Sequence, residues 1–219
     1  MNRIAHRGCA DQYPENTVLA ARRVADDVDA IEIDVRRCGS GELVVVHDDT
    51  IDRVTDGTGR VADLSLAALQ AHEVLDAGEP IPTLASFLDA VPDAVGVNVE
   101  LKERGLAAAV AAELAARENW FVVSSFDVEA LAEMRAVDDS IPLALLFQHD
   151  PDENLARAVE LDCEYVHPSA RLCLTTNVVA DAHRRGLDVN AWTATRATIA
   201  TALVKAGVDG VIADRTDCF

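Results

Sequence analysis

Seven residues of this chain could together bind a metal ion and transfer protons. They are two histidines, three carboxylates, one arginine and one lysine, and each lies near the end of a short apolar run. Such a mixture offers oxygen ligands for a cation, positive charge for an anion, and imidazoles for acid and base catalysis. The set comprises His6, Arg7, Glu32, Asp34, His47, Glu100 and Lys102.

The spacing of the carboxylates indicates a shared site. Glu32 and Asp34 are two residues apart, as are Glu100 and Lys102, so on a strand each pair points to one face. Three carboxylates gathered there would repel one another and raise their pKa values unless a cation neutralises them. We therefore expect one hard divalent cation, Mg²⁺, Ca²⁺ or Mn²⁺, with positions left for water and substrate.

The basic residues of the set suit a phosphorylated ligand. Arg7 and Lys102 would bring positive charge to a phosphate group, and Lys102 is one of only two lysines in the chain. His6 and His47 could serve as base and acid in the same reaction. The site is therefore expected to act on a phosphate ester.

Four other residues are candidates for supporting roles. Trp192 ends a predicted strand in a chain that is only 4% aromatic, so we expect it to form a wall of the substrate pocket. Phe147 is a weaker candidate for the same wall. Glu15 is expected to brace Arg7 from the second shell of the site. His167 also ends a strand, and a core or supporting role is expected for it.

Short β-branched runs that alternate with amphipathic segments predict the elements that must position these residues. Helix signals fall between the runs: Asn16 or Thr17 can cap one helix, Asp127 a second, and Asp152 opens a third. Gly186 and Gly207 suit left-handed helix ends. The predicted strands are residues 3–6, 30–35, 42–47, 96–102, 121–125, 142–147, 164–168, 188–193 and 210–214.

One connection breaks this alternation. Only the six residues 36–41 separate the second and third runs, too few for a parallel crossover, so we expect an antiparallel hairpin there. With a turn centred on Gly39 and Ser40, Glu32 lies opposite His47. The eight remaining runs predict a single-domain α/β fold, a (β/α)8 TIM-type barrel, whose chemistry gathers where the strands end. An open doubly wound sheet is the alternative, but no GxGxxG loop is present.

Composition excludes several classes of function. The chain has 219 residues, half of them hydrophobic, and a net charge of −19, which would repel nucleic acid and anionic membranes. It has no apolar run long enough to span a bilayer, and the first predicted strand starts too early to leave room for a signal peptide. A cytoplasmic location is expected, and excess Asp with scarce Lys suggests a halophilic source. The five cysteines include no CxxC pair and are expected to be reduced thiols.

Several longer motifs add a resemblance to a known family. The stretches are HRG, PENT, EIDV, VVVHDDTIDRVTDGTG, VNVELK, NAWTAT and GVDGVIAD. In this order, across nearly the whole chain, they resemble the signature of the glycerophosphodiester phosphodiesterase family. The stretch EYVHPSARLCL matches only loosely.

The resemblance implies a metal-dependent phosphoric diester hydrolase that converts glycerophosphodiesters to glycerol phosphate and an alcohol. It also implies that residues 1–219 form one barrel domain, in which residues 49–84 are a short form of the family's insertion. Its roles carry over to the residues already singled out. Glu32, Asp34 and Glu100 become metal ligands, His6 and His47 the acid/base pair, and Arg7 and Lys102 phosphate contacts.

Two other functions stay open at this stage. One is a phospholipase acting on intact lipid, which the lack of a basic membrane-docking segment disfavours. The other is an inactive barrel that only binds metal or a phosphorylated ligand. The nucleophile is either water or the neighbouring glycerol hydroxyl. Stable membrane association is not expected, and the oligomeric state and the leaving alcohol cannot be predicted.

Overall fold

Eight parallel strands close into a barrel, as predicted. A computed structural model describes residues 1–219, and its strands run in the order β1-β9-β8-β7-β6-β5-β4-β2, with β1 also paired to β2. β3 is antiparallel to β2 and lies outside the ring. The strands are β1 (Asn2–His6), β2 (Ala30–Arg37), β3 (Leu43–Val45), β4 (Gly96–Leu101), β5 (Phe121–Ser125), β6 (Leu143–Phe147), β7 (Tyr165–Pro168), β8 (Asp188–Ala194) and β9 (Gly210–Ala213).

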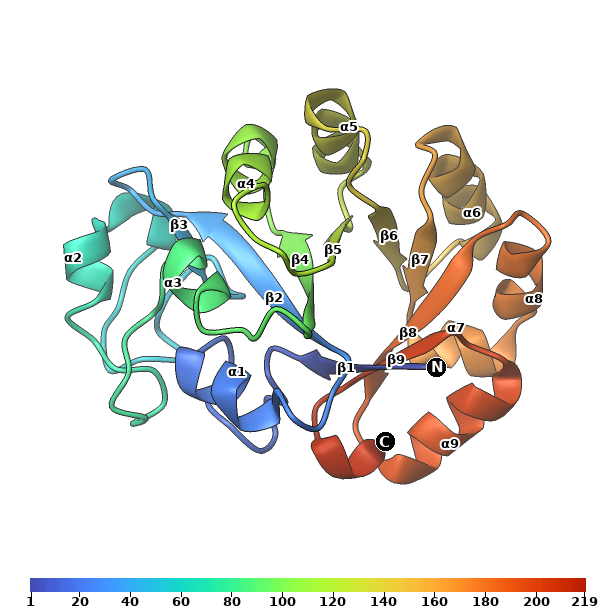
Figure 1. The fold of residues 1–219 in the computed structure, drawn as a ribbon, viewed down its shortest axis with the longest axis horizontal. Coiled ribbons are helices and arrows are strands. Elements are labelled where there is room, and N and C mark those ends of the chain that lie inside the picture. Colours follow the sequence, from blue (N-terminus) through green and yellow to red (C-terminus); the bar gives the residue numbers. More distant parts are fainter.

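Helices between successive strands surround this barrel (Figure 1). The N-terminal caps come from Thr17 for α1 and Asp127 for α5, whereas α6 begins one residue before Asp152, at Pro151. Gly207 takes a left-handed conformation at the end of α9. The ring helices are α1 (Val18–Val24), α4 (Ala107–Leu114), α5 (Val128–Val137), α6 (Pro151–Glu160), α7 (Ala170–Thr175), α8 (Val178–His183) and α9 (Ala197–Ala206), followed by the short η2 (Thr216–Cys218).

The predicted pairing of the hairpin is wrong by one residue. Val35 lies opposite Val45, and the Val46 N–H donates to the Asp34 carbonyl, so Glu32 and His47 are not paired. The reason is a three-residue turn rather than a two-residue one: the Cys38 N–H donates to the Glu42 carbonyl across Gly39–Gly41. Gly41, at φ +106°, supplies the left-handed conformation that this turn needs.

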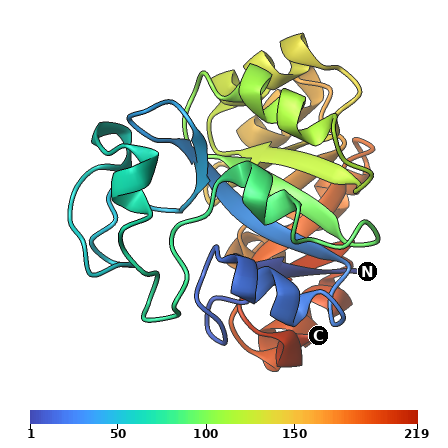
Figure 2. The ribbon, with the colours of Figure 1, turned by 60° about the vertical axis from the view of Figure 1, so that its left-hand side comes forward.

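Residues 49–84 leave the barrel and pack on the outer side of the hairpin (Figures 1 and 2). They contain η1 (Val61–Asp63) and α2 (Leu66–Leu69), and α3 (Leu84–Leu88) follows. Because side chains alternate along β3, Val45 packs in the main core while Val44 and Val46 pack in a second cluster of nine buried residues. That cluster holds this segment against the strand that leads to His47.

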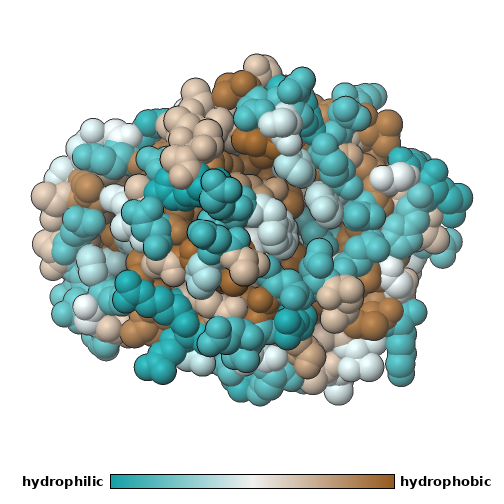
Figure 3. All heavy atoms as spheres, in the orientation of Figure 1, coloured by the Kyte–Doolittle hydropathy of each residue, from teal (hydrophilic) through white to brown (hydrophobic).

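Strand alternation also decides which residues face the inside of the barrel. On β2, Ile31, Ile33 and Val35 pack outward in the main core, so Glu32 and Asp34 face inward. Hydrophilic and apolar residues are interspersed on the face of the molecule that Figure 3 shows. All five cysteines are free and buried. None of the helices combines the length and the apolarity needed to cross a bilayer.

Candidate active site

The polar ends of the strands surround one pocket at the carboxyl-terminal mouth of the barrel. Its empty space, including the part open to solvent, is about 370 Å³. Two predicted residues do not line the pocket themselves. Asp34 belongs to the carboxylate cluster, and Glu15 accepts a hydrogen bond from Arg7. The lining residues are His6, Arg7, Glu32, His47, Asn98, Glu100, Lys102, Phe126, Leu146, Trp192 and Ile212.

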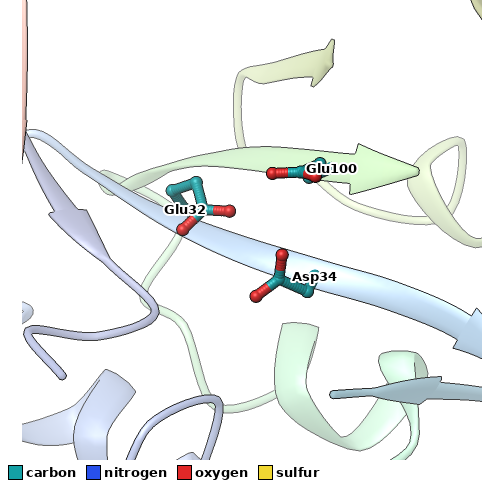
Figure 4. A group of neighbouring side chains, drawn as sticks. All are labelled: Glu32, Asp34 and Glu100. Carbon is teal, nitrogen blue, oxygen red and sulfur yellow. The ribbon is translucent and has the colours of Figure 1, made fainter. Parts of the chain in front are cut away.

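Three buried carboxylates form the centre of this site. In the parallel register, His6 lies beside Glu32, and Asp34 lies beside Glu100. One oxygen from each of Glu32, Asp34 and Glu100 lies within 4.8 Å of the others, and their carboxyl groups point toward one another (Figure 4). Adjacent strands therefore bring together acids that are 66 residues apart in the chain (34 to 100).

Two basic side chains already contact these carboxylates. Nζ of Lys102 lies 2.6 Å from Oε1 of Glu100 and 3.4 Å from Oδ1 of Asp34. Nε of Arg7 lies 3.2 Å from Oδ2 of Asp34, and its backbone N–H donates to Glu32. Two positive charges face three carboxyl groups, so ionisation of all three would leave an excess negative charge even with both bases in place.

The pKa values reflect this imbalance. Burial and the nearby charge of Asp34 raise the pKa of Glu32 to about 8, and the same two causes raise the pKa of Glu100. Burial also opposes the ionised form of Asp34, but Lys102 and Arg7 outweigh it and lower the pKa of that carboxyl. Burial thus makes it costly for all three groups to be ionised together.

The cluster fits a hard divalent cation. All its donors are carboxylate oxygens, which Mg²⁺, Ca²⁺ and Mn²⁺ prefer. Oε1 of Glu32 is buried without a hydrogen-bond donor, so it is available as a ligand. A divalent charge would offset the repulsion that raises the pKa values of Glu32 and Glu100. Residues Glu32, Asp34 and Glu100 are those that would hold it.

The residues of the PENT motif support the site in three ways. Glu15 accepts a hydrogen bond from Nη1 of Arg7 at 3.1 Å. The Asn16 side-chain amide donates to Oδ2 of Asp34 at 2.9 Å, and its backbone adopts φ +59°. Thr17 caps helix α1 by accepting from the Ala20 N–H. The motif therefore begins a helix and also contacts two site residues.

Each of the two pocket histidines has its own carboxylate partner. Nδ1–H of His6 donates to Oδ1 of Asp214 at 2.6 Å, which leaves Nε2 3.9 Å from Glu32. Nδ1–H of His47 donates to Oδ1 of Asp48, also at 2.6 Å. Bonding through Nδ1 fixes the tautomer and leaves Nε2 of each ring for proton transfer.

The two histidines differ in electrostatic environment. Burial lowers the pKa of His6, but the hydrogen bond to Asp214 and the charge of Glu32 outweigh it, and the net pKa is raised. Burial lowers the pKa of His47, and together with the charges of Lys102 and Arg7 it outweighs the raising effects of Asp34 and of the hydrogen bond to Asp48, so the net pKa is lowered. Opposite shifts suit one proton donor and one proton acceptor.

One side of the pocket is apolar. Trp192 lies there, its Nε1–H donating to the His167 carbonyl at 2.7 Å, and its ring meets Phe126 edge to face with centroids 5.4 Å apart. Phe147 does not reach this wall: it is buried in the outer core, and its neighbour Leu146 faces the pocket instead. The prediction fails because alternate residues of a strand face opposite sides.

His167 lies deeper in the barrel, in accordance with a core role. It is fully buried, and Asn190 donates its amide to Nε2 at 3.0 Å. Burial lowers the pKa of His167 to about 3, so the ring stays neutral. It does not line the mouth.

Several residues of the site were not singled out from the sequence. Asp48 and Arg53 lie within the long motif after the second histidine, and Asp214 ends GVDGVIAD, so the motifs contained them without indicating their partners. Asn98 precedes Glu100 by two residues, which is a usable sign that it shares the inward face. Phe126 lies beyond the end of β5 and gave no signal.

The comparisons with known proteins agree with this fold. Residues 6–218 match the model of the glycerophosphoryl diester phosphodiesterase family, and the chain belongs to that family. The expected enzyme class, a phosphoric diester hydrolase, is thereby confirmed.

Individual relatives match over nearly their full length. A glycerophosphodiester phosphodiesterase of Caldanaerobacter subterraneus subsp. tengcongensis is 32% identical, covering 96% of this chain and 93% of the relative. The putative glycerophosphodiester phosphodiesterase YhdW of Bacillus subtilis is 31% identical, covering 98% and 94%. An Oleispira antarctica phosphodiesterase, solved with the product sn-glycerol-3-phosphate, superposes with a TM-score of 0.93 at 29% identity, covering 99% of this chain and 94% of that one.

Proposed function

We propose that this protein hydrolyses water-soluble glycerophosphodiesters to glycerol phosphate and an alcohol, with the help of one divalent cation. The observation that carries the proposal is the single site, formed by the pocket and the cluster behind it, that combines three buried carboxylates, two bases and two carboxylate-bound histidines. The Oleispira phosphodiesterase with bound sn-glycerol-3-phosphate supports glycerol phosphate as the product.

Each group of residues has a defined task in this reaction. Glu32, Asp34 and Glu100 hold the cation, which when bound stabilises the negative charge that develops on the phosphoryl oxygens. Arg7 presents its guanidinium, and Lys102 its ammonium, to the non-bridging oxygens of the phosphate.

The histidines transfer the protons. One imidazole removes a proton from the attacking hydroxyl, which is either water or the neighbouring glycerol hydroxyl. The other protonates the oxygen of the departing alcohol, so that a neutral alcohol leaves. Their separate carboxylate partners, Asp214 for His6 and Asp48 for His47, keep the two Nε2 atoms available for these transfers.

The apolar side of the pocket contacts the carbon-bound part of the substrate. Trp192 and Phe126 present ring atoms, while the opposite side carries the charged residues. A substrate with a phosphate at one end and CH groups at the other matches this division. The amide of Asn98, buried without a protein partner, is available to hydrogen-bond a substrate hydroxyl.

A substrate panel tests the proposal. Glycerophosphodiesters with different alcohols would be incubated with the purified protein and Mg²⁺, Ca²⁺ or Mn²⁺ in turn, and intact phospholipid vesicles would form a separate arm. Hydrolysis of the soluble diesters that EDTA abolishes is the expected result. Activity only on vesicles would favour the phospholipase alternative, and no activity on any diester would favour an inactive barrel.

A further inference from the structure

Arg53 lies on the segment that packs outside the barrel, yet its side chain reaches two groups of the active site. Its Nε–H donates to Oδ2 of Asp48 at 2.6 Å. Its Nη1 and Nη2 donate to the two oxygens of Glu15 at 2.7 and 2.8 Å. One planar guanidinium thus uses three hydrogen bonds to join a residue after β3 to the loop before α1.

The two carboxylates that bind Arg53 each contact a reactive side chain. The other oxygen of Asp48 accepts from Nδ1 of His47 at 2.6 Å. Oε1 of Glu15 also accepts from Nη1 of Arg7 at 3.1 Å. A continuous chain of hydrogen bonds therefore runs from His47 through Asp48, Arg53 and Glu15 to Arg7.

The two carboxylates within this series of hydrogen bonds, Glu15 and Asp48, are held strongly by their partners. Glu15 is only 8% exposed and lies between two guanidinium groups. Burial disfavours its ionised form, but Arg53 and Arg7 outweigh burial and lower its pKa. Asp48 behaves similarly, since its bonds to Arg53 and His47 lower its pKa to about 2 against the effect of burial. Both carboxylates are ionised at neutral pH and hold their partners by charge-assisted bonds.

Arg53 also keeps Arg7 in place for its other contact. Arg7 uses Nη1 for Glu15 and Nε for Asp34, so its guanidinium lies between two acids. With Arg53 removed, the buried Glu15 would have Arg7 as its only cationic partner. Glu15 would then attract Arg7 more strongly, and the Arg7 guanidinium would move toward Glu15 and away from Asp34 and the pocket.

We propose that Arg53 is a positioning residue that orients His47 and Arg7 together, so that proton transfer and phosphate binding depend on one side chain from the outer segment. The inference rests on the proposed function, because it assigns tasks to His47 and Arg7. It also gives residues 49–84 a role in the reaction. The chemistry still occurs at His47 and Arg7, and Arg53 contacts no substrate.

A purely structural alternative is that Arg53 only fastens the outer segment to the barrel. Arg60 provides a matched control, because it lies on the same segment and pairs only with the exposed Asp49, at 3.1 Å. Arg53→Gln and Arg60→Gln each remove one charge from this segment. A fastening role would lower the stability of Arg53→Gln but leave its turnover unchanged, like that of Arg60→Gln.

The kinetic experiment compares Arg53→Gln, Arg53→Lys and Arg60→Gln with the unaltered enzyme. We expect Arg53→Gln to lower kcat/KM by about 10–100-fold, the usual effect of losing a residue that orients a reactive group. Arg53→Lys should recover little, because an ammonium cannot bond Asp48 and both oxygens of Glu15 at once. Arg60→Gln should match the unaltered enzyme, and equal activity of Arg53→Gln and Arg60→Gln would overturn the proposal.

Two further arms make the test specific. In a His47→Ala background, Arg53→Gln should cost less than it does alone, because one of the two groups it orients is already gone. Arg53 is about half exposed, so added guanidinium should reach the space left in Arg53→Ala and restore part of its turnover, whereas urea should not. Full additivity of the two substitutions and no guanidinium rescue would contradict positioning.

A crystal structure of Arg53→Gln gives a result that does not depend on activity. The proposal expects His47 and Arg7 both to change rotamer or to become disordered, while residues 49–84 stay folded. Unchanged side chains for both residues would overturn it even if turnover fell. An unaltered protein that hydrolyses no diester would contradict the proposed function instead, and the crystal structure would still decide whether Arg53 orients the two residues.

Discussion

His6 and Asp214 lie 208 residues apart in the chain, yet Nδ1 of the histidine is 2.6 Å from Oδ1 of the aspartate. The contact exists because β1 and β9 are the neighbouring strands that close the barrel, with Ala5 beside Ala213 in their register. Closure therefore gives the first histidine of the chain a carboxylate from the residue that follows the last strand. This partner is one of two groups that raise the pKa of His6.

Replacing this partner should weaken catalysis and shift its pH dependence. In Asp214→Asn we expect kcat to fall by about 10–100-fold, because the imidazole loses the charge that orients it. The pKa of His6 should drop, so the limb of the pH–rate profile that His6 governs should move to lower pH. If the alkaline limb moves, His6 is the acid, and if the acidic limb moves, it is the base. Asp217→Asn is the control, since Asp217 pairs only with Arg215, and an identical profile for both variants would refute the role of Asp214.

The choice of leaving group can show which histidine acts as the acid and which as the base. His6→Ala and His47→Ala should each lower turnover by about 10²–10⁴-fold, the usual effect of one acid or base group. With a nitrophenyl diester the leaving group needs no proton, so the variant lacking the acid should recover most of its rate. The other variant should not recover. Loss of bound metal in both variants, with recovery in neither, would mean that the histidines are ligands or supports.

The carboxylate cluster predicts strict dependence on the cation. Glu32→Gln, Asp34→Asn and Glu100→Gln keep the size of each side chain but remove a charge, and each should lower both metal affinity and activity. We expect an activity loss of at least about 10²–10³-fold, the effect of removing one charge-stabilising group. Calorimetric titration with Mg²⁺ or Mn²⁺ measures the first effect and the diester assay the second. Asp139→Asn, an exposed change, should alter neither, and full activity of all variants in excess EDTA would exclude the metal site.

The aromatic wall should affect substrate binding more than chemistry. Trp192→Ala should raise KM by about 5–20-fold with a smaller change in kcat, because it removes an apolar surface and the edge-to-face contact with Phe126. Trp120→Ala is a suitable control, since Trp120 is exposed beside Gly96 at the start of β4, away from the pocket. Equal changes in KM for the two variants would indicate a general loss of stability.

Buried His167 should make the fold less stable as the pH falls. Its folded pKa is about 3, below the ordinary value near 6.5, so between these values the unfolded chain binds a proton that the folded protein does not. The stability is complete above about pH 6.5 and declines as the pH falls toward 3, by at most about 1.4 kcal/mol per pH unit. Between pH 6.5 and 5 the unaltered protein should lose about 2 kcal/mol more than His167→Gln. Denaturant unfolding at both pH values measures this, and parallel losses would show that His167 does not titrate as described.

The sequence by itself determined the fold and brought forward the seven polar residues that the structure places around one mouth of the barrel. Nine predicted runs became nine strands, because β-branched residues and Gly or Asp boundaries act locally. The two-residue spacing of Glu32 and Asp34 was enough to place both on one face, since alternation along a strand needs no tertiary information. The barrel then followed from counting eight parallel strands and recognising one connection too short for a crossover.

Prediction from local sequence failed where a shift of one residue along a strand changed the result. The hairpin turn has three residues rather than two, so the predicted pairing of Glu32 with His47 was off by one. Phe147 was placed on the wall although its neighbour Leu146 occupies it. In both cases the sequence contained the right segment, but a shift of one position sends every side chain to the opposite face.

Only the tertiary structure decided which partners hold the reactive groups. Asp214 reaches His6 because the barrel closes, and Arg53 reaches both Asp48 and Glu15 because a small hydrophobic cluster holds the outer segment against β3. The spacing of these residues in the sequence does not predict either contact, because the separation of the bonded residues varies from 5 to 208 positions. Sequence pattern reports which face a residue occupies, whereas hydrogen-bond partners depend on how closed strands and packed loops meet in space.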